Sequence, residues 1–122
     1  MDDGIDALMR IIENPEGRAS GSIYNIGNPA NDFSVRDHAQ MMRALAAGYP
    51  EYRDSAARVS LVETSSGDYY GKGYQDVQNR VPKIDNTRQD LGWAPRVAMD
   101  EALRRIFDAY RGQVAEARAL LD

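Results

Sequence analysis

Apolar residues recur at helical spacing in the first stretch of the chain. Ile5, Leu8 and Ile12 lie at positions i, i+3 and i+7, which places them on one face of a helix over residues 2–13. Acidic residues fill its first turn, where the helix dipole is positive. The run Asn14-Pro15-Glu16-Gly17 ends this helix, because proline cannot extend an established hydrogen-bond ladder. These three residues therefore form one apolar face of the predicted helix. The methionines of the chain are interpreted as core filler, namely Met9, Met41, Met42 and Met99.

Three further helices are predicted from the same kind of pattern. One begins at Ser34, with Asp37 three residues later as in a capping box, and ends before the run Gly48-Tyr49-Pro50. Its buried stripe is Val35, Ala39, Met42 and Ala46. A short one is capped by Asp85 and closed by Gly92. The last has an apolar stripe formed by Met99, Ala102, Leu103, Ile106, Phe107 and Tyr110.

The remaining segments are assigned to strands or irregular structure. Residues 22–26 are apolar and bounded by glycines, which indicates a buried strand, and residues 58–63 alternate weakly and are β-branched, which indicates a second strand. Residues 51–58 are polar and are expected to be irregular. Beyond Gly112, residues 113–121 either continue as a helix or fray. Trp93 is expected to anchor the core. Together these elements predict a mixed α/β fold with two or three short strands and four helices.

Composition excludes several classes of function. A chain of 122 residues suffices for one small domain, and its net charge of −4 argues against a nucleic-acid or anionic-membrane surface. The absence of cysteine excludes disulfides, and with one histidine a Cys- or His-rich metal site is also excluded. No Gly-x-Gly-x-x-Gly run or P-loop occurs, and His38 on its predicted helix is interpreted as structural. The chemistry must therefore come from elsewhere in the chain.

The longest stretch without periodicity is the loop 64–82. Loops of this length inside a domain are usually functional or disordered. Its tyrosines offer flat rings for stacking on a base or sugar, Arg80 offers a planar fork of donors for a carboxylate or phosphate, and Lys72 adds a mobile charge. These residues suit a polyhydroxylated anionic ligand. The alternative is a solvated loop whose tyrosines pack on the domain.

The loop also carries a specific resemblance. The chain is similar to the UDP-glucuronic acid oxidative decarboxylases, which form the C-terminal half of bifunctional polymyxin-resistance proteins and belong to the extended short-chain dehydrogenase/reductase (NAD-dependent epimerase/dehydratase) superfamily. The similarity covers nearly the whole chain. It rests above all on the run Tyr69-Tyr70-Gly71-Lys72-Gly73-Tyr74-Gln75-Asp76-Val77 with Arg80 and Pro82, and on Ile26-Gly27-Asn28-Pro29 and Leu91-Gly92-Trp93 with Pro95.

The resemblance implies a reaction and roles for residues. NAD oxidises the C4 hydroxyl of UDP-glucuronate, carbon dioxide leaves, and the UDP-4-keto-pentose product serves the modification of lipid A with 4-amino-4-deoxy-L-arabinose. Arg80 stands where the family has the proton donor or carboxylate-facing group, and Tyr74, Tyr70 and Lys72 are the implied substrate-binding residues. This chain departs from the family's pattern beside Arg80, where charged or imidazole side chains are replaced by Gln78, Asn79 and Val81.

The resemblance also implies an organisation. Residues 1–122 would be a single substrate-side C-terminal domain of a cytoplasmic enzyme, whose Rossmann domain lies upstream and is the chain's partner. NAD would be bound by that domain and not by this chain, which alone would be inactive. A UDP-sugar is the expected ligand, a homo-oligomer is an open possibility, and no nucleic acid or membrane is expected. Alternatives are a fragment of a related sugar-nucleotide epimerase, dehydratase or UDP-xylose synthase, or a non-enzymatic interaction module.

Overall fold

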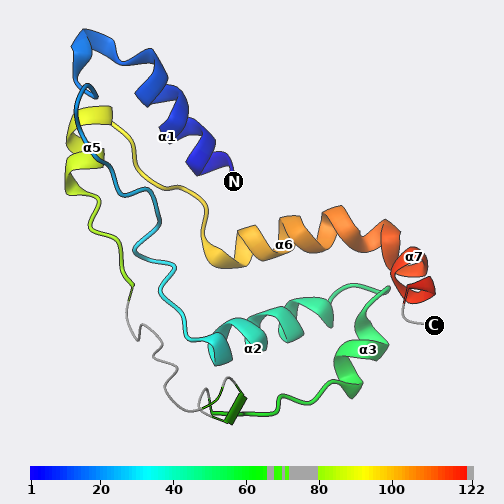
Figure 1. Cartoon of the computed structure of the whole chain (residues 1–122). Coiled ribbons are helices and arrows are strands. Elements are labelled where there is room, and N and C mark those ends of the chain that lie inside the picture. The colour runs from blue at the N-terminus through cyan, green and yellow to red at the C-terminus, as the bar shows by residue number, and fades with distance from the viewer. Residues whose placement is uncertain (66–67, 70, 72–79, 121–122) are drawn as a thin grey trace. The chain divides into compact units, whose positions relative to one another are not determined.

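The structure of the chain is a computed structural model that describes residues 1–65, 68–69, 71 and 80–120 (Figure 1). These residues form helices joined by irregular segments, and none of them belongs to a strand. The helices are α1 (Asp2–Glu13), η1 (Pro15–Gly17), α2 (Val35–Ala46), α3 (Arg53–Arg58), α5 (Asp85–Leu91), α6 (Met99–Tyr110), η2 (Arg111–Gln113) and α7 (Val114–Ala119). Among these, none is long and apolar enough to cross a membrane.

The described residues group into two compact units. The first comprises Met1–Asp32 and Arg80–Met99, so it contains α1 and α5. The second comprises the described residues within 33–79 and 100–122, so it contains α2, α3, α7 and all of α6 after its first residue. Each unit joins segments that are far apart in the sequence, which means that its packing depends on long-range contacts.

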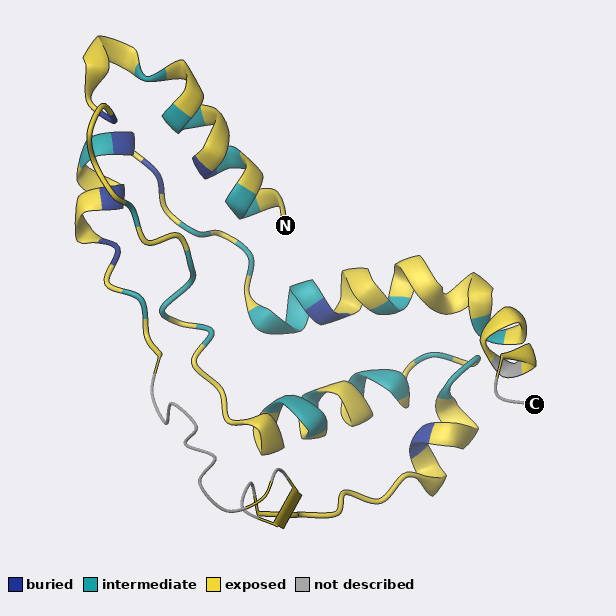
Figure 2. Cartoon of the chain, viewed as in Figure 1, coloured by how far each residue is buried: buried dark blue, intermediate teal, exposed yellow. Residues whose placement is uncertain are grey.

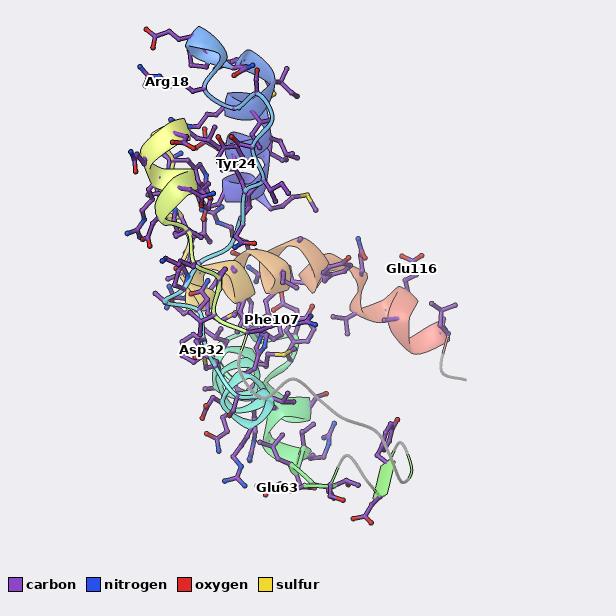
Figure 3. The ribbon with its side chains drawn as sticks, turned by 60° about the vertical axis from the view of Figure 1, so that its left-hand side comes forward. Arg18, Tyr24, Asp32, Glu63, Phe107 and Glu116 are labelled. Carbon is purple, nitrogen blue, oxygen red and sulfur yellow. The ribbon has the colours of Figure 1, made fainter. Side chains whose placement is uncertain are left out.

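The core of the first unit is built around Trp93. This side chain is only 1% exposed, and its Nε1–H donates a hydrogen bond of 2.9 Å to the carbonyl oxygen of Asp3. The buried residues packed with it are Ala7, Ala19, Ile84 and Leu91 (Figure 2). Tyr24 packs against this cluster and its hydroxyl lies 3.1 Å from Asp90 Oδ2 (Figure 3). The prediction that Trp93 anchors the core is confirmed.

Helix α1 has the predicted bounds, but the apolar face formed by Ile5, Leu8 and Ile12 does not pack on the core. The side that contacts the rest of the unit carries Ala7, which is fully buried, and Arg10, whose guanidinium donates to the carbonyls of Leu91 and Gly92 at 3.0 and 3.1 Å. The interpretation of Met9 as core filler is wrong, because this side chain is 48% exposed and a small residue is what the close contact at Trp93 and α5 admits. The residues left exposed are Ile5, Leu8, Met9 and Ile12.

Helix α2 begins as predicted. The Ser34 hydroxyl accepts a hydrogen bond from the Asp37 amide, and the Asp37 carboxylate accepts one from the Ser34 amide, which is a complete capping box. The predicted stripe is only partly correct, because Ala39 is half-buried whereas Val35 is 88% exposed. A further helix, α3, occupies most of the stretch that was expected to be irregular, and its Ala56 is buried.

Helix α6 supplies the aromatic packing of the second unit. Leu103 is buried. The ring centroid of Phe107 lies 5.5 Å from that of Tyr49 and 5.4 Å from that of Tyr52 (Figure 3). The chain beyond Gly112 continues as helix α7, which settles the alternative left open by the sequence. The helices predicted at both ends of the chain are thus confirmed.

The two predicted strands are not present. Residues 22–26 run as irregular chain whose carbonyls at Ile23 and Asn25 accept hydrogen bonds from side chains of α5, so no ladder partner takes them. In the other predicted strand, Arg58 ends α3 and residues 59–63 are irregular and exposed. A strand needs a neighbouring strand for its backbone groups, and the described part of the chain supplies none for either segment.

Candidate functional site

The segment that follows Arg80 is fastened to residues 23–27 by a series of side-chain hydrogen bonds. The Asn25 amide donates to the carbonyl of Lys83 at 3.2 Å, and the Thr87 hydroxyl donates to the carbonyl of Asn25 at 2.8 Å. The Asn86 amide donates to the carbonyl of Ile23 at 3.0 Å. Thr87 is fully buried, so its hydrogen bond is shielded from water. These bonds fix the path of the chain where it leaves the loop.

A close contact between Gly27 and Pro82 completes this attachment. A Cβ atom added at Gly27 would lie 2.9 Å from Pro82 Cγ, which is closer than carbon atoms normally approach. Any larger residue at this position would therefore force Pro82 or the Gly27 backbone to shift. Arg80 stands two residues before Pro82, so the anchored segment determines where the backbone of Arg80 lies.

Arg80 presents an exposed cation at this position. Its side chain is exposed, and within the described residues its guanidinium has no hydrogen bond and no ion pair. By contrast, the guanidinium groups of Arg10 and Arg96 in the same unit both contact Asp6. An exposed guanidinium on an anchored backbone offers a planar fork of donors to a carboxylate or phosphate of a ligand.

The other predicted substrate-binding residues cannot be placed beside Arg80. Tyr70, Lys72 and Tyr74 lie outside the described residues, as does most of the loop in which they were found. Where the structure describes this loop, the Ser65 hydroxyl lies 2.6 Å from Asp68 Oδ2 and accepts from the Asp68 amide at 3.1 Å. Ser65 is thus a hydrogen-bonding residue of the loop. The structure locates Arg80 alone among the four predicted site residues.

The second unit contains an apolar cavity that sequence reasoning did not find. Its volume is about 320 Å³, and it is lined by Ala39, Met42, Arg43, Ala46, Tyr52, Ser55, Ala56, Val59, Leu61 and Phe107. Its one cationic side chain is already engaged, since Arg43 Nε donates to the carbonyl of Ala56 at 3.2 Å. Such a lining does not suit a charged sugar nucleotide. Two of its lining residues, Val59 and Leu61, belong to the segment 58–63 that the sequence assigned to a strand.

The described residues do not fit a dinucleotide or a metal ion. A pyrophosphate is commonly held at a helix N-terminus by free amides and the positive end of the dipole. Every α-helix whose bounds are given above has an acidic residue in its first turn, namely Asp2, Asp37, Asp54, Asp85, Asp100 and Glu116 among others. These carboxylates repel a phosphate. No group of three or more His, Asp or Glu side chains in the described residues could hold a metal.

Comparison with known proteins finds a solved structure that is similar to nearly the whole of this chain. A scan against models of protein families finds no match. A search of solved structures finds the crystal structure of the PbgP3 protein from Burkholderia pseudomallei, which is 62% identical to this chain with a TM-score of 0.80. The match covers 98% of this chain and 32% of PbgP3, so the chain spans about a third of the length of PbgP3. This similarity agrees with the resemblance to polymyxin-resistance proteins, of which PbgP3 is a homologue.

Proposed function

We propose that this chain is the substrate-side portion of an NAD-dependent UDP-glucuronate oxidative decarboxylase of lipid A modification, with the architecture of an extended short-chain dehydrogenase/reductase. In this proposal Arg80 binds the C6 carboxylate of the sugar. The observation that carries the proposal is the exposed guanidinium of Arg80, which has no partner in the described residues. The backbone that bears this side chain is anchored two residues later, where Pro82 contacts Gly27. The 62% identity with PbgP3 supports the same assignment.

The proposed reaction explains why a cation is needed at this point. NAD, held by a part of the protein outside this chain, supplies the oxidation of the C4 hydroxyl to a ketone. The ketone lies β to the carboxylate, so the C5–C6 bond breaks, carbon dioxide leaves, and the electron pair remains on the sugar as an enolate that is protonated at C5. Arg80 binds the carboxylate before this step, and its fixed positive charge stabilises the enolate as it forms. Because a guanidinium holds its proton tightly, a water molecule beside Arg80 is the proton source that fits best.

The loop residues complete the proposed site. Tyr74 would contact the nucleotide sugar with its ring or hydroxyl, with Tyr70 as a second contact. Lys72 would add positive charge to a site whose ligand carries both a diphosphate and a carboxylate. These roles rest on the resemblance of the loop sequence, since the three residues lie outside the described part of the chain.

The experiment uses a PbgP3 chimera in which this chain replaces the third of PbgP3 that it matches. Release of labelled carbon dioxide from UDP-glucuronate labelled at C6 is measured for the chimera, for Arg80→Met and for the control Arg88→Met. Arg88 is also an exposed arginine of the first unit. We expect Arg80→Met to lower the rate at least about 100-fold, because it removes a charged contact to the reacting group, while NAD binding stays unchanged.

Two results would contradict the proposal. One is a rate for Arg80→Met equal to that of Arg88→Met. The other is a chimera that binds NAD and converts a neutral UDP-sugar but releases no carbon dioxide, which would indicate an epimerase or dehydratase of the same superfamily. A neutral sugar has no carboxylate for Arg80 to bind.

A further inference from the structure

Helix α1 presents its largest apolar side chains away from the unit to which it belongs. Ile5 is 51% exposed, Leu8 54%, Met9 48% and Ile12 73%. Their spacing of three or four residues places them along one stripe of the helix, which we call the α1 apolar face. Figure 2 shows α1 with a buried position on one side and exposed positions along the other. Exposed apolar stripes of this kind mark interaction surfaces.

The other side of α1 is already occupied, so the helix cannot turn to bury this stripe within the unit. Ala7 is fully buried, and the carbonyl of Asp3 accepts the Trp93 indole N–H. Asp3 Oδ2 also accepts hydrogen bonds from the amides of Arg96 and Val97, at 3.0 and 2.9 Å. These contacts fix the rotation of the helix about its own axis. The α1 apolar face is therefore a stable feature of the folded unit.

The charges around the α1 apolar face indicate what kind of surface it meets. A cavity of about 280 Å³ adjoins the face at Met9, and its lining includes two acidic residues, Asp6 and Glu13, and one basic residue, Arg10. Asp6 contacts Arg10 and Arg96, whereas the exposed Glu13 has no partner among the described residues. A lysine or arginine from a docked surface would complete this site. The face thus favours an apolar surface with a basic rim.

A second copy of the chain does not fit this requirement. Helix α1 contains four acidic residues and a single basic residue, Arg10. The guanidinium of Arg10 is held by the carbonyls of Leu91 and Gly92. Two α1 helices placed face to face would therefore bring carboxylates together and leave Glu13 without a cation, which is unfavourable in a symmetric contact.

We propose that the α1 apolar face docks onto the part of the longer protein that lies outside the region matched in PbgP3, through an apolar surface with a basic rim. The length of the relative supports this occupant, because this chain covers only 32% of PbgP3 and the remaining two-thirds are available to cover the face. The inference rests on the part of the proposed function that makes this chain one portion of a longer enzyme. It does not depend on the reaction or on Arg80.

The test measures the accessibility of the face with single cysteines, since the chain has none of its own. Ile12→Cys and Ile5→Cys are made in the 122-residue chain and in the PbgP3 chimera, with Val35→Cys as the control. Val35 lies on α2 and is 88% exposed. Each protein is treated with a maleimide reagent, and the labelling rate at the introduced cysteine is read by peptide mass spectrometry.

We expect the cysteines at positions 12 and 5 to react at least about tenfold more slowly in the chimera than in the chain, and the cysteine at position 35 to react at similar rates in both. Equal rates at positions 12 and 5 in the two proteins would overturn the proposal. So would protection in the chain alone that grows with its concentration, because a second copy would then cover the face. Protection in a chimera that releases no carbon dioxide would leave this inference standing and contradict the decarboxylase assignment instead.

Discussion

The contact between Gly27 and Pro82 predicts the effect of adding a single methyl group. In Gly27→Ala the new Cβ would lie 2.9 Å from Pro82 Cγ, whereas carbon atoms in favourable contact lie about 3.5–4.0 Å apart. Pro82 must therefore move by roughly half an ångström or more. Overpacking of this kind costs about 1–3 kcal/mol, which lowers the melting temperature of a domain of this size by about 4 °C per kcal/mol. We expect Gly27→Ala to be destabilised within that range.

Thermal unfolding of the single and double variants checks the reasoning. Pro82→Ala removes the Cγ atom, so Gly27→Ala with Pro82→Ala should be more stable than the sum of the single losses predicts, by about 0.5–3 kcal/mol. Gly4→Ala is the matched control, because an added Cβ there meets no atom within 4 Å, and it should stabilise α1 by about 0.5–1 kcal/mol. The proposed contact would be refuted if Gly27→Ala were as stable as the unchanged chain. It would also be refuted if the double variant regained none of the stability lost in the single variants.

Two further predictions concern the separate units. Trp93→Phe removes the indole N–H that donates to the carbonyl of Asp3, and we expect a loss of about 2 kcal/mol or more in chemical denaturation; a loss below about 0.5 kcal/mol would contradict its role as the anchor. In the second unit, the hydroxyl and amide of Ser34 hold the pKa of Asp37 below its usual 3.8. A depressed carboxyl pKa in the folded state contributes stability that is present above the unfolded value and is lost as pH falls through the folded value. Circular dichroism should therefore show α2 weakening below about pH 4. Ser34→Ala should reduce this dependence, because it removes the hydroxyl and keeps the backbone amide; an acid response identical in Ser34→Ala would contradict it.

The sequence predicted most of the helices because their signals are local. The spacing of apolar residues in α1 and α6 and the capping residues Ser34 and Gly92 act within one or two turns. The short helix α3 was missed because its six residues are polar apart from alanines and show no apolar stripe. Its position depends on Ala56, which is buried by contacts that the local pattern does not reveal.

What the sequence could not predict depends on partners that are distant along the chain. The segments 22–26 and 58–63 have the composition of strands, but a strand forms only where another strand can pair with it. The helical period of α1 identified an apolar stripe correctly and could not tell which surface the stripe meets. Likewise, Arg80 could be named from the loop, whereas the attachment of its backbone through Gly27 and Pro82 joins residues more than fifty positions apart.

The central claim is that Arg80 recognises the carboxylate of a nucleotide-linked sugar acid, and the affinity of the PbgP3 chimera for two ligands tests it most directly. Isothermal titration with UDP-glucuronate and UDP-glucose compares sugars that differ only in the carboxylate. A charged hydrogen bond contributes about 1.5–3 kcal/mol, so we expect a preference for UDP-glucuronate of roughly 10- to 100-fold. In Arg80→Met this preference should vanish while the affinity for UDP-glucose stays the same. An undiminished preference in Arg80→Met would contradict the claim.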